Sequence, residues 1–345
     1  MEIPARTVPG VKSSSISRII QGNMALAPGV ILVGIACGGV FAVYNKLWGI
    51  ALSLALLFLL YLAVNMKSST AEMSASPEHM VLRGGYGFTL SIPLKNGHIF
   101  ILTILMAITA CEWIFAFRDV ALGIVLSLFL AILIYLIISV FKVDQDHINA
   151  SESLTLIPLY ILFTSSLPWF FLATEVRLPA VYSIIIALCA WHIYQRGIQL
   201  DDLGFKRENV LPAILLGVVL GVQAGIIEYF VINVEPMHPD FSVAYLLRDF
   251  FYMLFFVGLA EEVLFRRIIQ RDLIKIFGCH GGIFLQAALF GVMHLTWRSH
   301  LELFFTFAVG LVLGYFYQRT GSLTGPVIMH GIGNTMLVAV MPYIV

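Results

Sequence analysis

The feature that most constrains this chain is a series of long apolar runs separated by shorter polar segments. The runs are about 17–23 residues long, close to the roughly 20 residues that a helix needs to cross a bilayer. Of all residues, 60% are hydrophobic and only 12% are charged, a balance far more apolar than that of a soluble domain. The runs do not show the alternating pattern of membrane β-strands. The sequence therefore predicts an all-α, polytopic transmembrane helix bundle.

The apolar runs predict about ten or eleven membrane spans. They lie at 28–45, 47–66, 98–117, 120–141, 153–174, 178–194, 210–233, 246–270, 281–298, 302–318 and 323–344. Residues 1–27 are polar and mildly basic, which favours a cytoplasmic tail over a cleaved signal. The polar stretches 67–97 and 195–209 are expected to be connectors.

The distribution of basic residues predicts an orientation. When the spans alternate from a cytoplasmic N-terminus, only five of the 20 Lys and Arg residues fall on the outer side. These five are Lys46, Arg118, Arg177, Arg248 and Arg298. Because cytoplasmic loops carry an excess of Lys and Arg, we expect the N-terminus to be cytoplasmic.

Charge and cysteine content bear on other classes of protein. The formal net charge is zero, and no basic cluster offers a footprint for nucleic acid. Nucleic acid is therefore not expected as a partner. The four cysteines, Cys37, Cys111, Cys189 and Cys279, stand alone without paired spacing. We interpret them as small helix residues rather than as metal ligands or disulfide partners.

Two adjacent glutamates stand near the end of one apolar run, in the sequence GLAEEVLFRRIIQR of residues 258–271. A carboxylate inside a membrane span is costly and indicates a functional site. Glu262 and Arg266 are four residues apart on the predicted helix, so they share a face and can neutralise each other. Glu261 points about a hundred degrees away and is left without that partner. An interfacial cluster of charges with the neighbouring arginines is the structural alternative.

Three further polar residues lie at comparable depth on two later spans. His294 ends a Phe290–x–x–x–His294 pattern, and His330 and Asn334 are four residues apart on one helix face. Glu261 lies about 15 Å from the cytoplasmic end of its span. On the same basis, His294, His330 and Asn334 lie about 20, 10 and 16 Å from that membrane face. A lone histidine in an apolar helix is usually a packing residue, but four costly side chains in one slab predict a shared cavity.

These residue types suit hydrolysis in two ways. In the first, Glu261 is a general base on water and His294 shares the proton, while His330 and Asn334 donate to the oxyanion. In the second, Glu261, His294 and His330 are three ligands of a catalytic zinc with an open fourth position. The HExxH and GxSxG patterns of other hydrolases do not occur in the sequence. The residues alone leave activation by glutamate and activation by metal open.

The three motifs in this order resemble those of a known family. Glu261–Glu262–x–x–x–Arg266, Phe290–x–x–x–His294 and His330–x–x–x–Asn334 are similar to the motifs of the CAAX protease and bacteriocin-processing family. This family of intramembrane endopeptidases includes the Ras-converting CAAX enzymes, and the resemblance covers residues 195–345.

The resemblance implies a role for each motif residue. Glu261 would activate water with support from Glu262 and Arg266, and His294 would be the second catalytic group. His330 and Asn334 would stabilise the tetrahedral oxyanion. Family members have been described both as metalloproteases and as glutamate-dependent proteases without metal. We favour the second description, so zinc remains an alternative and no cofactor is assigned.

The chain thus divides into three predicted parts: a cytoplasmic tail (1–27), an N-terminal transmembrane region of unknown role (28–194) and a CAAX protease-like catalytic domain (195–345). We expect an intramembrane endopeptidase that cuts a hydrophobic or lipid-modified substrate near the cytoplasmic face of a bacterial or archaeal plasma membrane. The alternative is a non-catalytic scaffold or immunity protein, or a proton-coupled transporter in which the same residues form a proton path.

Two weaker features complete the predictions. Glu112, in the segment CEWIF, is another deeply placed carboxylate. The stripes Gly217–x–x–x–Gly221 and Gly310–x–x–x–Gly314 place small residues on one helix face. Stripes of this kind allow helices to approach closely, so we expect them to pack against other helices.

Overall fold

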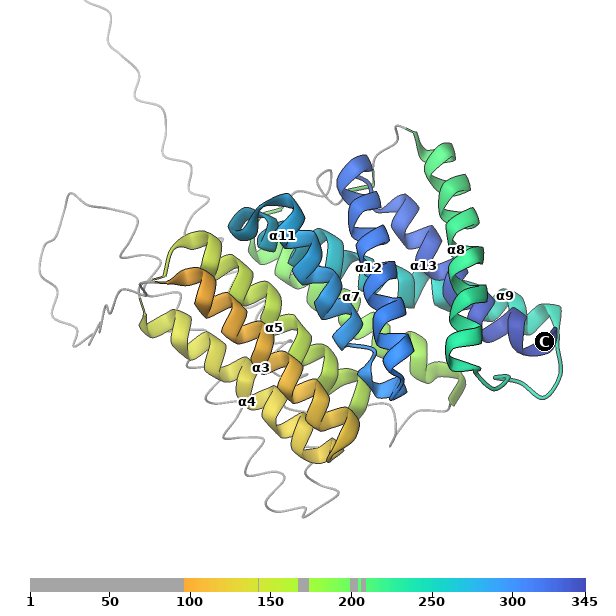
Figure 1. Cartoon of the computed structure of the whole chain (residues 1–345), viewed down its shortest axis with the longest axis horizontal. Helices are drawn as coiled ribbons and strands as arrows, with labels where there is room; N and C mark the ends of the chain where they lie inside the picture. The colour runs from red at the N-terminus through yellow and green to blue at the C-terminus, as the bar shows by residue number, and fades with distance from the viewer. Residues whose placement is uncertain (1–95, 142, 167–173, 199–203, 206–208) are drawn as a thin grey trace, which may run out of the picture.

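The structure is a computed structural model that describes residues 96–141, 143–166, 174–198, 204–205 and 209–345 (Figure 1). The predicted tail, the first two predicted spans, Cys37, nearly all of the 67–97 connector and much of the 195–209 connector lie outside the described residues. Within the described part of the chain, every regular element is a helix. This confirms the all-α class.

The α-helices are α3 (Gly97–Phe117), α4 (Val120–Val140), α5 (Gln145–Ser166), α7 (Thr174–Gln195), α8 (Val210–Ile232), α9 (Val243–Tyr252), α10 (Leu259–Glu262), α11 (Arg271–Val292), α12 (His300–Thr320) and α13 (Thr324–Thr335). The π-helical segments are η2 (Met253–Gly258), η3 (Val263–Gln270) and η5 (Met336–Val340), and the short 3-10 helices are η4 (Leu295–Trp297) and η6 (Met341–Tyr343). Elements α9, η2, α10 and η3 follow one another without a break, and we call residues 243–270 the glutamate helix.

Among the described residues, seven helical stretches are long and apolar enough to cross a membrane. The chain is therefore an integral membrane protein. One stretch, Val243–Trp297, contains two of the predicted spans. They are separated by a kink at Gly278, where the chain leaves helical geometry with a φ of +74°. Glycine adopts this left-handed conformation at little cost. A Cβ added to Gly282 would lie 2.6 Å from the backbone nitrogen of Ile274. The helical segments before and after Gly278 therefore pack closely where the chain reverses.

Helix α5 departs most from the prediction, since it begins at Gln145 and the expected span begins at 153. The Asp144 side chain accepts a hydrogen bond from the His147 backbone N–H at 3.1 Å, and such a bond caps a helix start. Burial raises the pKa of Asp144, but hydrogen bonds from His147 outweigh it and hold that pKa below its usual value. Capping extends the helix beyond the N-terminal end of the apolar run. Helix α5 is not among the seven stretches that are long and apolar enough to cross a membrane.

The helices form one connected bundle. Helices α3, α4 and α5 pack side by side, α11 packs against α12, and α8 runs along α13 (Figure 1). Helix α7 contacts both α5 and the glutamate helix. The largest buried apolar cluster includes Ile108 of α3, Leu162 of α5 and Phe265 and Ile269 of the glutamate helix. The helices of the N-terminal region therefore share a core with the helix that carries the two glutamates.

The predicted glycine stripe of α8 lies against α13. A Cβ added to Gly217 would lie 2.7 Å from the Gly325 carbonyl oxygen, and one added to Gly221 would lie 2.5 Å from that of Met329. Only glycine permits backbones to approach this closely. Because His330 follows Met329 in the chain, this contact fixes the position of a motif residue.

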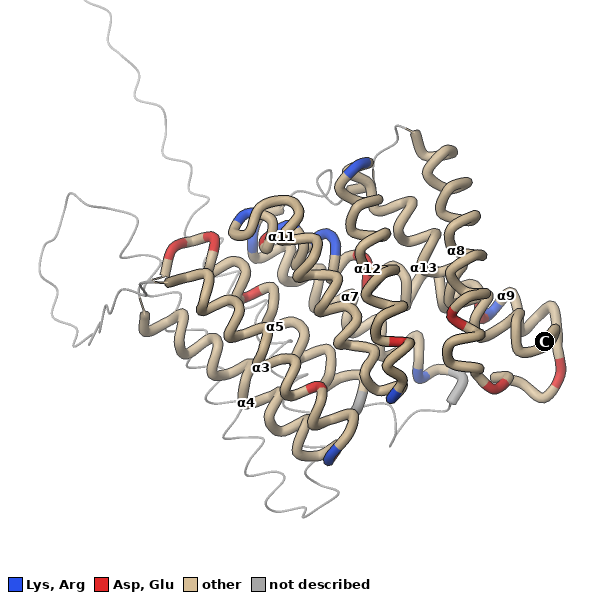
Figure 2. Tube along the Cα trace, in the orientation of Figure 1, with Lys and Arg blue, Asp and Glu red and all other residues tan. Residues whose placement is uncertain are grey.

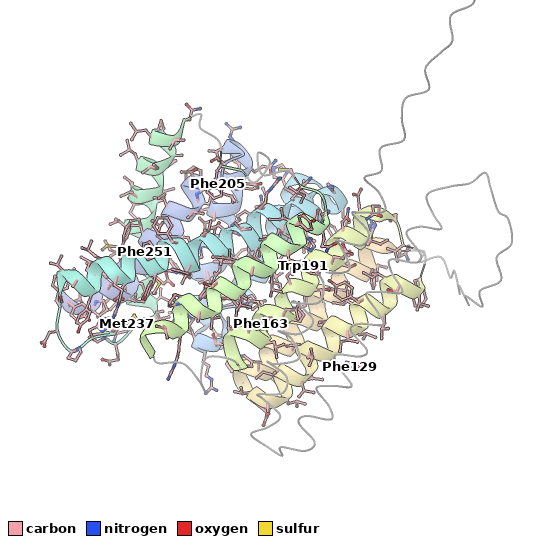
Figure 3. All side chains as sticks on the ribbon, turned by 180° about the vertical axis from the view of Figure 1, so that it is seen from behind. Phe129, Phe163, Trp191, Phe205, Met237 and Phe251 are labelled. Atoms are coloured by element: carbon pink, nitrogen blue, oxygen red, sulfur yellow. The ribbon has the colours of Figure 1, made fainter. Side chains whose placement is uncertain are left out.

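The outer surface suits a lipid environment. In Figure 2, Lys and Arg lie mainly near the ends of the long helices. Phe129 of α4 is 57% exposed, whereas Phe163 of α5 is fully buried (Figure 3). Large apolar side chains on the outside of a helix bundle are stable where hydrocarbon surrounds them.

Candidate active site

Glu262 is completely buried and is bound on two sides. Arg266 Nε donates to Glu262 Oε2 at 2.8 Å from one turn further along the glutamate helix. His330 Nδ1, on α13, lies 2.8 Å from Glu262 Oε1. The predicted ion pair is therefore present, and it extends to a histidine from a second helix. Since the side chains of Glu262 and Arg266 are both fully inaccessible, each charge depends on the other for neutralisation.

A close helix contact brings His330 to Glu262. A Cβ added to Gly258 would lie 3.2 Å from both the Gly331 nitrogen and the Val327 oxygen. A Cβ added to Gly331 would lie 2.7 Å from the Leu254 Cα. The glutamate helix and α13 therefore touch through two glycines. His330, next to Gly331, is consequently within reach of the carboxylate.

Glu261 is also buried, but its surroundings differ. Tyr160 of α5 and Tyr182 of α7 donate to Glu261 Oε1 at 2.8 and 2.9 Å, and their two hydroxyl oxygens are 3.0 Å apart. Glu261 Oε2 lies 3.7 Å from His330 Nε2. Glu261 therefore has two hydroxyl partners that the sequence did not predict. One of its oxygens is held by tyrosines and the other is turned toward His330.

The remaining motif residues meet at a small cavity. His294, His330 and Asn334 line a space of about 20 Å³, together with Glu228 and Thr306. This volume is sufficient for about one water molecule. His330 lines this cavity and also faces Glu261, whose Oε2 lies 3.7 Å from its Nε2, so this histidine links the cavity to the second carboxylate.

The hydrogen bonds of the two histidines define what each ring can do. His294 Nδ1 lies 2.8 Å from the Phe290 carbonyl oxygen. A carbonyl only accepts, so this nitrogen carries the proton and Nε2 of the neutral ring is an acceptor. His330 Nδ1 faces Glu262, which leaves His330 Nε2 as a donor only when the ring is an imidazolium. An imidazolium there has a carboxylate beside each nitrogen.

Phe290, the first residue of the second motif, packs among the charged groups. Its ring lies edge-on to the His330 ring, with centroids 5.8 Å apart, and 4.8 Å from the His294 ring. The Arg266 guanidinium lies 4.9 Å from its centroid, a cation–π distance. The aromatic residue therefore holds both histidines and the arginine in fixed relative positions.

Three residues of the site were not predicted from sequence. Tyr160 and Tyr182 belong to the N-terminal region and share no spacing with the motifs, and the chain has 13 tyrosines. Glu228 lies in the α8 span and lines the small cavity. For the tyrosines the only available signal was general, since a buried tyrosine hydroxyl needs a hydrogen-bond partner. For Glu228 the available signal was a carboxylate inside an apolar span.

The arrangement does not fit a metal ion. Among the residues that the structure describes, no group of three or more His, Cys, Asp or Glu side chains is placed to hold one. In particular, Glu261, His294 and His330 do not form the zinc set considered from sequence. His294 Nδ1 and His330 Nδ1 are bonded to Phe290 and Glu262, so each ring has only Nε2 left for a ligand. We therefore derive no chemical step through a metal.

Fold and site together define a class: a multi-span helical membrane protein with a buried carboxylate–histidine centre. Residues 243–336 match the model of the family described as type II CAAX prenyl endopeptidase Rce1-like. This match confirms the resemblance inferred from the motifs and supports a membrane protease. It includes all three motifs, but it is shorter than residues 195–345 and covers less than half of the chain. No curated protein and no solved structure matches the chain.

Proposed function

We propose that this protein is an intramembrane endopeptidase that hydrolyses a peptide bond in a hydrophobic or lipid-modified substrate, such as a CAAX-type tail or a leader or sorting segment. The observation that carries the proposal is the division of the two adjacent glutamates. Glu262 is neutralised by Arg266 and His330, whereas Glu261 is held by two neutral hydroxyl groups. Arg266 and His330 engage both oxygens of Glu262, whereas the tyrosines bind only Oε1 of Glu261 and leave Oε2 for chemistry.

Glu261 is the general base in this proposal. Its Oε1 is fixed by Tyr160 and Tyr182, so Oε2 is the oxygen that takes a proton from water. The water oxygen then bonds to the carbonyl carbon of the substrate. His294, whose Nε2 is an acceptor, shares the proton and delivers it to the leaving amine as the C–N bond breaks.

His330 and Asn334 hold the developing oxyanion. Both side chains line the small cavity. The Asn334 amide offers N–H donors, and His330 offers one at Nε2 when its ring is an imidazolium. Donors fixed before the reaction stabilise the charge that appears in the transition state. Glu262 and Arg266 support this role, because Glu262 fixes the orientation of the His330 ring.

The location of the reaction follows from the predicted topology. A cut near the cytoplasmic face, in a bacterial or archaeal plasma membrane, agrees with the placement of most Lys and Arg residues on one side. Lipid bilayer and an apolar peptide are the partners that this proposal requires.

The test is a cleavage assay with purified protein in lipid, using an S-farnesylated peptide with a CAAX end and an unmodified hydrophobic leader peptide, each with and without a chelator. We expect wild-type protein to cut one of them with the chelator present, and Glu261→Gln to lower the rate about 10²–10⁴-fold. Glu235→Gln, in a loop, is the control and keeps the parental rate. If folded wild-type protein cuts neither peptide but moves protons across the membrane, the protease proposal is rejected in favour of the transporter.

A further inference from the structure

A much larger cavity lies on the other side of Glu261. Its volume is about 1080 Å³, and its walls come from α3, the start of α4, α5, α7 and the chain that follows α11. Tyr160 and Tyr182 line it, and the same two hydroxyl groups bind Glu261. The cavity therefore reaches the candidate base through these tyrosines. Most of its wall comes from helices that precede the segment matched by the family.

The wall of this cavity is apolar except for a few placed groups. Glu112 of α3 is 2% exposed, and its Oε2 finds no hydrogen-bond partner among the described residues. Arg298 and Thr296 lie on the wall near the end of α3, where Arg298 Nε donates to the Ala116 carbonyl at 2.9 Å. Burying a carboxyl oxygen without a partner is costly. Glu112 is thus a buried carboxyl group on the cavity wall that a ligand with a hydrogen-bond donor would satisfy.

The chemistry of a membrane-embedded cut specifies what that ligand is. A peptide bond must leave its helix before water can attack it, and the unwound segment exposes N–H and C=O groups. In hydrocarbon these groups have no water to bind, so unwound backbone persists only where protein satisfies it. The cavity offers an acceptor in Glu112 and donors in Arg298 and Thr296. A hydrocarbon chain would need none of these groups.

We propose that the cavity binds the unwound peptide segment of the substrate next to the scissile bond, and that Glu112 accepts a backbone N–H of that segment. This inference rests on the proposed protease function. Arg118, Arg177 and Arg298 mark the outer side in the predicted topology, so the bound segment lies on the outer side of the cut. Helices α3, α5 and α7 of the N-terminal region thereby gain a role in holding the substrate.

Photo-crosslinking tests occupancy without requiring turnover. The photoreactive residue p-benzoylphenylalanine replaces Phe115, which lines the cavity, in an inert Glu261→Gln background. The matched control replaces Phe129, which projects outward from α4 and is exposed (Figure 3). The probes are the two peptides of the cleavage assay, carrying biotin. We expect a peptide adduct at position 115 at least tenfold more abundant than at position 129. A phospholipid adduct at position 115, or equal peptide adducts at both positions, overturns the inference.

Two substitutions of Glu112 test the anchor. Glu112→Leu removes the acceptor and should lower the peptide adduct at Phe115 and raise KM about tenfold, with kcat within about twofold, because binding and not chemistry is lost. Glu112→Gln keeps an acceptor oxygen, so its peptide adduct and its KM should both stay close to those of the protein with Glu112. Unchanged KM and crosslinking in Glu112→Leu would contradict the assignment.

Failure of the inference and failure of the protease function give different results. Crosslinking at position 115 without any cleavage by wild-type protein removes the proposed reaction and leaves the peptide site. Cleavage that depends on Glu261 without crosslinking at position 115 removes the peptide site and leaves the reaction.

Discussion

At the scale of single residues, the neighbours Glu261 and Glu262 differ in what binds them. Glu262 takes part in an ion pair with Arg266 and contacts His330, while Glu261 receives two tyrosine hydroxyls. One helical step of about 100° is enough to turn the two carboxylates toward different helices. Adjacent identical residues thereby receive one structural and one chemical role.

The buried ion pair predicts a large effect on stability. Arg266→Ala leaves Glu262 buried without its main partner, which costs about 3–5 kcal/mol for pairs of this kind. We expect a clear drop in the midpoint of thermal unfolding in detergent. Arg267→Ala, which removes a neighbouring arginine that has no ion pair to Glu262, is the control and should change the midpoint much less. Equal midpoints for both variants would disprove the pairing.

The two tyrosines that bind Glu261 predict an effect on the cleavage rate. Tyr160→Phe or Tyr182→Phe removes one hydrogen bond to a charged acceptor, worth about 1.5–3 kcal/mol of stability. In the variant that remains folded, Glu261 Oε1 is less firmly held, so kcat should fall at least tenfold. Tyr135→Phe removes the hydroxyl of a half-buried tyrosine on α4 and should leave kcat unchanged. If all three variants cleave at the same rate, the tyrosines do not position Glu261.

The motif residues could be predicted from sequence, whereas the tyrosines could not. Glu262 and Arg266 belong to one helix, so a spacing of four residues suffices to pair them. Tyr160 and Tyr182 reach Glu261 from helices far away in the chain, and that contact depends on how α5 and α7 pack. Periodicity describes one helix at a time, so it could not show that these two tyrosines bind Glu261.

At the scale of helices, the site depends on close contacts between α13 and its neighbours. Glycines of α8 and of the glutamate helix allow α13 to come near both elements. The stripe at Gly217 and Gly221 was predicted as a packing feature, and the structure places it beside Met329 and hence beside His330. The start of α5 was predicted too late, since hydropathy does not register the polar turns that Asp144 caps.

The α8–α13 contact predicts a linked loss of stability and activity. Gly221→Leu inserts a side chain where a Cβ would already lie 2.5 Å from the Met329 oxygen, so α13 must move and carry His330 and Asn334 with it. Overpacking of this kind costs about 1–3 kcal/mol or more. Val219→Leu, on the exposed face of α8, is the control. Unchanged unfolding midpoint and cleavage in Gly221→Leu would show that the contact is dispensable.

At the scale of the whole molecule, the site joins the N-terminal region to the segment matched by the family. The glutamate helix shares one apolar core with α3, α5 and α7, and the tyrosines come from α5 and α7. The predicted boundary near residue 195 therefore passes between residues that contact one another. Nothing in local sequence indicates this, because a shared core appears only once distant spans have packed.

The predicted orientation has a direct test with a native cysteine. Cys279 is exposed and lies next to the reversal at Gly278, on the side expected to be cytoplasmic. In a Cys37→Ser background, a membrane-impermeant maleimide should label Cys279 only after the cells are opened. With Cys279 also replaced by serine, a cysteine introduced as His300→Cys, on the expected outer side, should react in intact cells. The reverse pattern would invert the topology.

The division of the two glutamates is tested most directly by comparing Glu261→Gln with Glu262→Gln in two measurements on the same samples, cleavage rate and unfolding midpoint. The expected result is a crossed pattern. Glu261→Gln loses about 10²–10⁴-fold in rate and unfolds close to wild type, since its amide oxygen still accepts from the tyrosines. Glu262→Gln unfolds several degrees lower, because Arg266 loses its counter-charge. Cleavage at the parental rate by Glu261→Gln would contradict its assignment as the base.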